Sequence, residues 1–455
     1  MTIESVNPAT GRAIASYELT PASALPGIVE RAHAAFLGWR RAAFADRAAA
    51  MERAAGILLR NQREYAQLMA EEMGKPVRNG LEEVRACATL CRHYAEHAAA
   101  MLADQPVATE WSRSRVVYRP LGVVLGVQPW NWPFHQVFRM VVPALMAGNA
   151  VVVKHASNVP GCALAIEDVF VRAELPRDLL RVLLLASQDV EALISHPLVR
   201  GVSLTGSGPA GAAVARAAGG KLKKSVLELG GSDPYLVLAD ADIELAARVC
   251  TEGRLSNSGQ SCIAAKRMIV VEEVRAAFEA RFVALMAAAR VGDPLLDATD
   301  VGPIARRDLR DALHAQVQAS VAAGARLLLG GVLPEGAGAF YPSTVLTDVR
   351  RGMPAFDEEL FGPVAAIVPV ADERAAIAAA NDSAYGLGAC VLTRDVQRGE
   401  RIAADLLDCG MAWVNGCVRE DPRLPFGGVK DSGYGREQST WGIREFVDVK
   451  TVVVA

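Results

Sequence analysis

The sequence lacks the features that mark several classes of protein. Its 455 residues include only eight cysteines and no CxxC pair, so neither a disulfide scaffold nor a zinc ribbon is indicated. No run of about 18 apolar residues occurs, which argues against a transmembrane helix. The opening segment, MTIESVNPATGR, lacks the basic-then-apolar pattern of a signal peptide. We therefore predict a cytoplasmic protein without a membrane partner.

An excess of charge of one sign is also missing. Lys and Arg number 48 against 51 for Asp and Glu, which argues against a protein that binds nucleic acid through bulk charge. Cys87, Cys91 and His93 are close enough to suggest a metal site. Their segment has a helical pattern that places the two thiols on its apolar face, so we predict no metal.

What the sequence does contain is an alternation of strand and helix patterns. Residues 21–103 are Ala-rich with helical periodicity, and residues 107–127 are rich in β-branched residues. Strand patterns then alternate with helix patterns, as in VVLGV, AVVVKHA, RVLLLA and VRGVSLTGS, which indicates βαβ units and a parallel sheet. The alternation restarts near residue 230, which predicts a second α/β domain. The last strand, in REFVDVKTVVVA, has no partner nearby in the sequence. An unpaired strand of this kind often pairs with a strand of another subunit.

Three residues near predicted strand ends or loops are candidates for chemistry. Cys262 lies in SNSGQSC, a predicted loop, although a small buried cysteine is the plainer interpretation. Glu228 ends an apolar strand, where burial would raise its pKa toward that of a useful general base; an exposed loop carboxylate is the alternative. Asn131 follows another strand as either a helix N-cap or an oxyanion donor.

A glycine-rich turn, SLTGSGPAG, leads from a strand into a helix. Its backbone N–H groups could hold a phosphate. It matches neither GxGxxG nor a P-loop, so it indicates a nucleotide only together with other signals.

Taken together, these segments resemble the aldehyde dehydrogenase superfamily. The resemblance rests on PWNWPF, VVVKHASN, TGSGPAG, LELGGSDP, GQSC, EELFGPV and PFGGVKDSGYGRE, in family order from about residue 3 to the C-terminus. Within the superfamily, KHASN and LELGGSDP are most similar to the bacterial succinate-semialdehyde dehydrogenase branch. The resemblance implies NAD(P)-dependent oxidation of a small aldehyde, with succinate semialdehyde first among the substrates.

The resemblance also implies a role for each candidate. Cys262 would attack the aldehyde carbon to form a thiohemiacetal and then a thioester, while Asn131 and the backbone N–H of Cys262 hold the oxyanion. Glu228 would activate the water that releases the free acid. Members that transfer the acyl group to coenzyme A lack a carboxylate at this position.

The cofactor residues follow from the same resemblance. They are Trp130 and Leu229 near the nicotinamide, Lys154 on the adenosine ribose, Gly206 and Ser207 on the pyrophosphate, and Glu359 and Phe361 on the nicotinamide ribose and ring. NAD-selective relatives carry a Glu three residues after the ribose lysine, where this chain has Ser157. The small neutral side chain predicts that NADP is accepted and that NAD is also usable.

The implied architecture is an α/β fold with three parts. A Rossmann-like parallel-sheet cofactor domain would comprise residues 1–105 and 123–230, and an α/β catalytic domain residues 231–420. A small β oligomerisation arm would combine residues 106–122 and 438–455, with a loop at 421–437 that returns toward the active site. The arm implies a homodimer or homotetramer.

Substrate recognition is predicted to involve an arginine. If the segment after Asn131 is helical, His135 and Arg139 share a face, and the guanidinium could bind a distal carboxylate; a surface or structural Arg is the alternative. Some semialdehyde dehydrogenases carry a second Arg six residues before the catalytic cysteine, where this chain has Ser256. Arg254 and Arg423 are the possible substitutes.

Other functions stay open on the sequence alone. The same chemistry could act on an amino- or aryl-aldehyde. A cysteine hydrolase would need a histidine partner for the thiol, and only His135 and His155 lie in the strand-end motifs. A non-catalytic binding protein would not need the thiol, the carboxylate and the amide together.

Overall fold

A six-stranded sheet forms the core of the first half of the protein, in a computed structural model that describes residues 2–455. The strand order is β19–β9–β8–β5–β6–β7, and every neighbouring pair is parallel except β19 with β9. Its strands are β5 (Val123–Gln128), β6 (Ala150–His155), β7 (Leu180–Leu183), β8 (Val199–Thr205), β9 (Lys224–Glu228) and β19 (Gly433–Tyr434). The parallel strands are largely buried, which explains their nearly continuous apolar runs.

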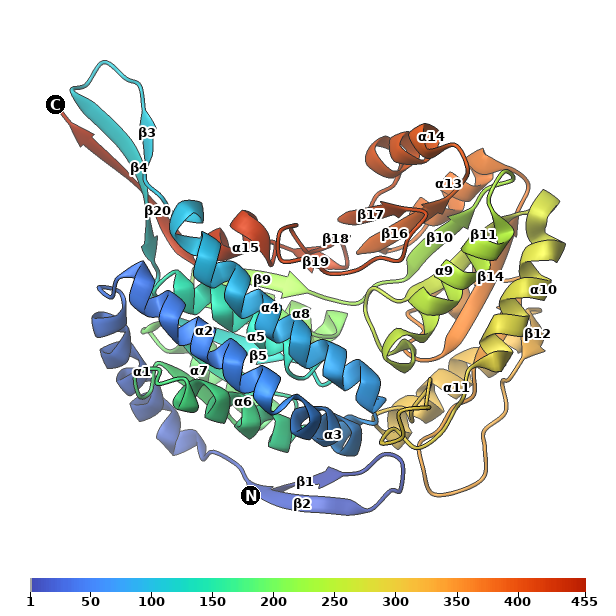
Figure 1. Ribbon diagram of the computed structural model, residues 1–455, viewed down its shortest axis with the longest axis horizontal. Coiled ribbons are helices and arrows are strands. Elements are labelled where there is room, and N and C mark those ends of the chain that lie inside the picture. Colours follow the sequence, from blue (N-terminus) through green and yellow to red (C-terminus); the bar gives the residue numbers. More distant parts are fainter. Residues whose placement is uncertain (1) are drawn as a thin grey trace.

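Helices cover this sheet on both faces, as expected for parallel strands (Figure 1). They are α1 (Leu25–Trp39), α2 (Phe44–Arg60), α3 (Gln62–Met73), α4 (Val77–Met101), α5 (His135–Met146), α6 (Pro160–Arg172), α7 (Val190–Ser195) and α8 (Gly208–Gly219). Helix α4 packs against α2, α3 and α5, so its apolar stripe, with Cys87 and Cys91, is buried. None of the helices in residues 2–455 is both long and apolar enough to cross a membrane.

A seven-stranded sheet forms the second half, in the order β12–β13–β14–β11–β10–β16–β17. Only its edge strand β12 is antiparallel to its neighbour. The strands are β10 (Asp233–Val237), β11 (Ala265–Val271), β12 (Arg326–Leu329), β13 (Thr344–Thr347), β14 (Val364–Val370), β16 (Gly388–Leu392) and β17 (Met411–Val414). The helices around it are α9 (Ile243–Leu255), α10 (Glu272–Ala288), α11 (Arg307–Ala322), α12 (Pro354–Asp357), α13 (Glu373–Asn381) and α14 (Val396–Arg401). The α/β fold predicted from the alternating patterns is confirmed.

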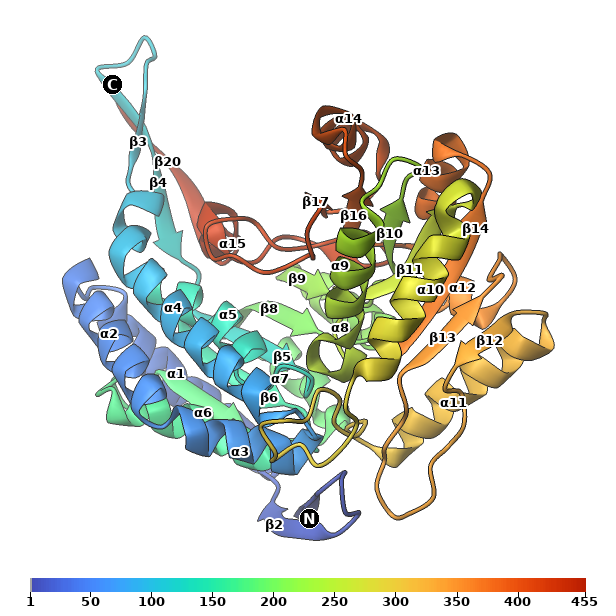
Figure 2. The ribbon, with the colours of Figure 1, turned by 45° about the vertical axis from the view of Figure 1, so that its right-hand side comes forward.

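Three strands project from the body as a narrow arm, which both ribbon views show (Figures 1 and 2). They are β3 (Gln105–Val107), β4 (Arg113–Pro120) and β20 (Val447–Val454), and helix α15 (Ser439–Glu445) leads into the last of them. Strand β20 pairs with β4 along its whole length. Val449 and Val453 are nevertheless exposed, so the arm presents apolar surface to solvent.

Two small β elements complete the fold. The N-terminal hairpin of β1 (Thr2–Val6) and β2 (Ala13–Glu18) was not predicted from the sequence, because its strands carry no simple alternation. It is tied to the body where Ser5 donates a hydrogen bond to Glu72 (2.8 Å). The pair β15 (Tyr385–Gly386) and β18 (Val429–Lys430) holds the chain that returns between the two halves.

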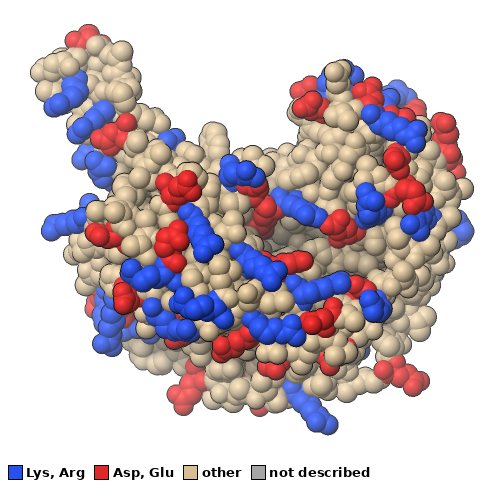
Figure 3. All heavy atoms as spheres, in the orientation of Figure 1, with Lys and Arg blue, Asp and Glu red and all other residues tan. Residues whose placement is uncertain are grey.

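The candidate residues of the first half lie at one edge of its sheet. Asn131 follows β5, Lys154 lies at the end of β6, Gly206 follows β8, and Glu228 is the last residue of β9. Because neighbouring strands are parallel, their carboxyl ends meet at this edge, where ligands bind in open α/β sheets. The face seen in Figure 3 carries basic and acidic side chains intermingled, in keeping with the balanced charge of the sequence.

Candidate active site

The loop before Cys262 has a strained backbone. Between α9 and β11, Asn257, Ser258 and Gly259 have φ values of 52°, 56° and 74°, and two of them are residues that rarely adopt this left-handed region. A Cβ on Gly259 would lie 2.3 Å from the carbonyl oxygen of Gly362, so only glycine fits there. Strain of this kind persists where the surroundings fix the backbone, and it is concentrated at functional sites.

Asn131 holds this loop from the opposite half of the protein. Its Nδ2 donates a hydrogen bond to the carbonyl of Gln260 (3.1 Å), and Asn257 donates to the carbonyl of Asn131 (2.7 Å). The structure therefore brings the Asn131 amide to a residue that lies only two positions before Cys262. An amide N–H in that position can stabilise an oxyanion that forms beside the thiol.

Burial holds the pKa of the Cys262 thiol above its ordinary value. The residue is only partly exposed, and burial raises the pKa of the thiol to about 12, with Arg139 and Lys266 acting against the rise and Glu359 and Glu420 adding to it. The Lys266 ammonium lies beneath the loop and donates hydrogen bonds to the carbonyls of Ser261 (2.9 Å) and Cys262 (2.5 Å). The thiol must therefore lose its proton to a base as it attacks an electrophile.

Glu228 is a buried carboxyl group without a partner. Its relative exposure is 1%, and neither side-chain oxygen has a hydrogen-bond partner among residues 2–455. Burial raises its pKa well above the ordinary value and Glu437 adds to the rise, while Arg139 acts against it. A carboxylate whose pKa is raised in this way is a stronger base than an ordinary one, which is what the activation of water requires.

The predicted nicotinamide residues lie close to one another. The rings of Trp130 and Phe361 are 5.7 Å apart in an edge-to-face arrangement. Leu229 packs so closely on α8 that a Cβ on Gly211 would lie 2.5 Å from it. Glu359 accepts a hydrogen bond from the backbone N–H of Gly231 (3.0 Å), and its carboxylate lies 3.3 Å from the ammonium of Lys266.

The turn from β8 into α8, which was predicted to bind phosphate, is open. Ser207 is exposed at the start of α8, a Cβ on Gly208 would meet nothing within 4 Å, and α8 has no side-chain cap. By contrast, α5 begins at backbone N–H groups of Phe134 and His135 that donate to Glu83 (2.8 and 2.9 Å). The free N–H groups of α8 can therefore bind an anion from solution.

Lys154 and Ser157 were predicted to receive the adenosine ribose. Burial lowers the pKa of the Lys154 ammonium, and no carboxylate is among the causes of that shift. Ser157 lines a cavity of about 730 Å³ together with Glu4, Arg306 and Arg307, and Lys154 is not among the lining residues. Arg306 is paired with Asp308 (2.6 Å), so the small neutral side chain of Ser157 is what leaves room for a 2′-phosphate here.

The three predicted substrate arginines all have protein partners. Arg139 is completely buried and pairs with Glu420 (2.7 Å) and Glu437, and these carboxylates raise its pKa although burial alone would lower it. Arg254 donates to the carbonyl of Gly259 (2.6 Å). Arg423 is exposed and pairs with Asp421. Arg254 therefore supports the catalytic loop and Arg423 lies at the surface, so a role for either in substrate binding stays a prediction that these contacts do not favour.

The whole chain matches a known family. Residues 1–452 match the model of the aldehyde dehydrogenase family.

The chain belongs to the aldehyde dehydrogenase family.

Its relatives include bacterial proteins named as succinate-semialdehyde dehydrogenases. A Synechocystis protein named as a probable succinate-semialdehyde dehydrogenase [NADP(+)] is 44% identical over the full length of both chains. The Escherichia coli K12 succinate semialdehyde dehydrogenase [NAD(P)+] Sad is 45% identical over 98% of this chain and 97% of its own. The crystal structure of succinic semialdehyde dehydrogenase from Streptococcus pyogenes in complex with NADP+ aligns with a TM-score of 0.97 at 33% identity, over 99% of each chain.

Histidine partners for the thiol are not apparent in this aldehyde dehydrogenase. The ring of His155 hydrogen-bonds the carbonyl of Pro133 (2.8 Å), and burial lowers its pKa to about 4. His135 lies 3.3 Å from Glu420. Both histidines therefore serve other contacts, which disfavours a cysteine hydrolase.

Several residues around the site were missed by reasoning from the sequence. Lys75 and Glu83 form a completely buried ion pair, and the Lys75 ammonium lies 3.7 Å from the ring centre of Trp132, next to Asn131. Glu437 was passed over although it pairs with Arg139. Nothing local distinguishes these charged residues from solvated ones, because their partners are identified only by the fold.

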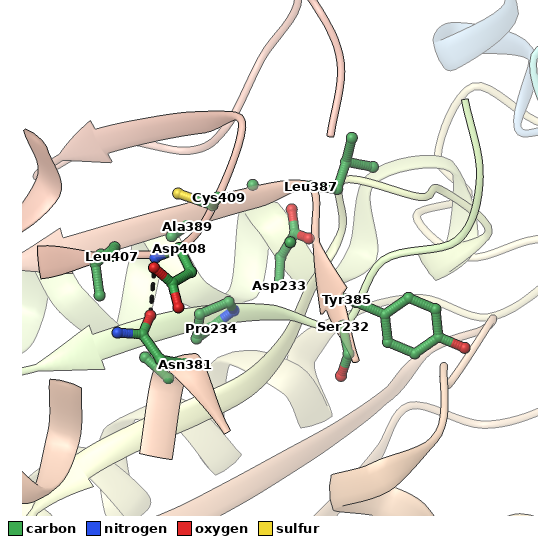
Figure 4. Close-up of a pocket in the computed structure, with 13 residues that line it drawn as sticks. Ser232, Asp233, Pro234, Asn381, Tyr385, Leu387, Ala389, Leu407, Asp408 and Cys409 are labelled. Atoms are coloured by element: carbon green, nitrogen blue, oxygen red, sulfur yellow. Dashed lines mark hydrogen bonds between the residues drawn. The ribbon is translucent and has the colours of Figure 1, made fainter. Parts of the chain in front are cut away.

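A further buried carboxyl group, Asp233, lies in the second half of the enzyme. It lines a small cavity with Cys409 and Asp408 (Figure 4). Its relative exposure is 1%, and burial raises its pKa to about 7 although Lys266 acts against the rise. The folded enzyme therefore keeps a proton on Asp233 that the unfolded chain, with a pKa of about 3.9, has already released.

The Asp233→Asn variant is expected to gain stability over the wild type as pH rises. Between about pH 4 and pH 7 the unfolded wild-type chain loses its Asp233 proton while the folded chain retains it, so wild-type stability falls across this window and Asn abolishes that fall. The difference should grow by about 2 kcal/mol from pH 5 to pH 8, measured as a difference in melting temperature. The control is Asp408→Asn, a carboxylate at the same cavity that is mostly exposed. Equal behaviour of the two variants would show that Asp233 ionises normally.

Proposed function

We propose that this aldehyde dehydrogenase oxidises succinate semialdehyde to succinate, with NADP as the preferred acceptor and NAD also usable. The observation that carries the chemistry is the meeting of the Cys262 loop with the Asn131 amide, with the buried Glu228 at the same edge of the first sheet. The full-length relatives named as succinate-semialdehyde dehydrogenases support the substrate. NADP, which the streptococcal enzyme holds in its crystal structure, would be the hydride acceptor.

In this proposal the two halves of the protein have different roles. The six-stranded half holds the cofactor, with its pyrophosphate at Gly206 and Ser207 and its adenosine ribose at Lys154 and Ser157. The seven-stranded half carries Cys262. The arm of β3, β4 and β20 joins a second copy of the chain as a homodimer or homotetramer, which the exposed valines of β20 support. The cytoplasm remains the expected location.

Each residue of this chain has a defined task in the reaction. The Cys262 thiol gives up its proton to solvent water as its sulfur bonds to the aldehyde carbon, and the oxygen of that aldehyde accepts hydrogen bonds from Asn131 Nδ2 and the Cys262 backbone N–H. The hydride of that carbon would pass to the nicotinamide of NADP, and the acyl group remains on the sulfur as a thioester. Glu228 then takes a proton from water, the resulting hydroxide attacks the thioester, and the C–S bond breaks to release the free acid.

The substrate assignment is tested by comparing succinate semialdehyde with butyraldehyde, which lacks the carboxylate. With NADP we expect kcat/KM to favour succinate semialdehyde by at least about tenfold.

The Cys262→Ala variant should bind NADP in a fluorescence titration but retain less than about 1% of the turnover, because no other nucleophile replaces the thiol. A preference for butyraldehyde or for an amino-aldehyde would overturn the substrate, and turnover by Cys262→Ala would overturn the nucleophile.

The Glu228→Gln variant is expected to slow thioester hydrolysis more than hydride transfer. The amide fills the same space but cannot accept a proton, so steady-state turnover should fall by about 100-fold. Rapid mixing should then show a burst of reduced cofactor, near one equivalent per active site, before slow turnover. The Cys262→Ala variant provides the control without a burst. Unchanged turnover with no burst would remove Glu228 from this role.

The Ser157→Glu variant is expected to shift cofactor preference toward NAD. A carboxylate facing the ribose would repel a 2′-phosphate while leaving NAD its hydroxyl partners. The ratio of kcat/KM for NADP to that for NAD should fall at least about tenfold. Ser157→Gln, with the same size and no charge, should change the ratio much less. A wild-type enzyme that is already strictly NAD-dependent would contradict this prediction.

A further inference from the structure

Two nitrogens of the Arg139 guanidinium already face carboxylates, and the third, Nη2, has no hydrogen-bond partner among residues 2–455. Its Nη1 lies 2.7 Å from Glu420, and its Nε contacts Glu437. Both carboxylates face one cation whose side chain is completely buried. A substrate carboxylate that binds where either glutamate now lies must therefore displace that glutamate, because one edge of the guanidinium cannot hold both.

Of the two carboxylates, Glu420 is the one that can leave. Glu437 is buried, whereas the side chain of Glu420 is 19% exposed. Glu420 also comes from the other half of the protein, on the loop that follows β17. That loop is attached to the second half where the backbone N–H of Val418 donates to Tyr235 (2.9 Å) and where Arg419 pairs with Glu252.

The groups around the Glu420 carboxylate form an anion-binding cage. One oxygen faces Arg139. The other lies 3.3 Å from the His135 ring and accepts a hydrogen bond from Gln438 (2.7 Å). His135 and Arg139 are one turn apart on α5, which starts just after the Asn131 loop. The cage is close enough to the catalytic thiol for Arg139 and Glu420 to change the pKa of Cys262 in opposite directions.

We propose that Glu420 is a specificity-determining residue that occupies the binding site for the substrate carboxylate and competes with it for Arg139. The proposal rests on the proposed function, because it takes the substrate to be a carboxylated aldehyde. When that substrate binds, the Glu420 side chain leaves the cage toward solvent, and the substrate carboxylate takes its place on Arg139, His135 and Gln438. An uncharged aldehyde of the same length gains nothing from this exchange. Glu420 thus weakens the binding of the anionic substrate relative to the uncharged one.

The test removes the charge of Glu420 and keeps its shape. In Glu420→Gln, the KM for succinate semialdehyde should fall about tenfold with little change in kcat, while kcat/KM for butyraldehyde stays within about twofold. Succinate, assayed as a competitive inhibitor of butyraldehyde oxidation, should bind the variant more tightly by a similar factor. Glu252→Gln removes a carboxylate that pairs with the same loop at the surface, and should leave all three values unchanged.

A second variant links the effect to Arg139. In the Arg139→Leu background, Glu420→Gln should no longer lower the KM for succinate semialdehyde or tighten inhibition by succinate. A gain that survives the loss of Arg139, an equal change for both aldehydes, or an unchanged succinate inhibition constant would each overturn the competition. A selective loss of activity on 4-aminobutyraldehyde in Glu420→Gln would instead assign Glu420 to a cationic substrate.

The same measurements show whether the competition or the substrate assignment is wrong. If the wild type favours succinate semialdehyde over butyraldehyde but Glu420→Gln brings no gain, only the competition is wrong. If neither the wild type nor Glu420→Gln favours succinate semialdehyde, the substrate assignment fails and the competition fails with it.

Discussion

The position of the Cys262 thiol depends on one backbone carbonyl, that of Gln260. It accepts hydrogen bonds from the side-chain amides of Asn131 (3.1 Å) and Asn257 (3.0 Å), which come from different halves of the protein. The left-handed turn that precedes Cys262 is strained, so it needs fixed partners on both sides. The junction between the two sheets is thus what sets the geometry of the nucleophile, and neither half alone contains the site.

Two buried acidic side chains near that junction, Glu83 and Glu228, have opposite surroundings. The Lys75–Glu83 pair is fully buried and satisfied, since Glu83 also accepts two backbone N–H groups at the start of α5. Its energetic role is to fix the Asn131 loop, because breaking one partner of such a pair leaves an uncompensated charge. Glu228 is equally buried but has no hydrogen-bond partner among residues 2–455, so its burial raises the pKa of the carboxyl group instead. Burial therefore makes the structure rigid where the charges are paired, as at Lys75 and Glu83. It makes the carboxylate a stronger base where it has no partner, as at Glu228.

The sequence was sufficient for the βαβ order and for the candidate residues that follow its strands. Parallel strands place their carboxyl ends at one edge, so residues such as Asn131 and Glu228, far apart in the chain, were expected near each other. The N-terminal hairpin, the Lys75–Glu83 pair and the two carboxylates on Arg139 could not be predicted in this way. A charged residue on a helix has the same local pattern whether it is solvated or buried against a partner that only the fold brings to it. For Arg139, helical spacing predicted the shared face with His135 correctly, but only the fold revealed that Glu420 already binds to that face.

Distant carboxylates also explain where a dinucleotide can bind. Four helices, α5, α6, α7 and α8, follow the parallel strands of the first sheet, and the first N–H groups of each have no partner within the helix. Glu83 from α4 occupies the start of α5, and Glu72 from α3 accepts the N–H groups of Gly161 and Cys162 at the start of α6. Helices α7 and α8 have no such side-chain cap, but α7 starts at Asp189 and carries Glu191 in its first turn, and both carboxylates oppose an anion. The protein therefore fills two of these four helix starts with its own glutamates, places acidic side chains at the third and leaves the start of α8 open. In the proposed function, the anionic cofactor would bind at this open helix start, next to the strand that ends at Glu228.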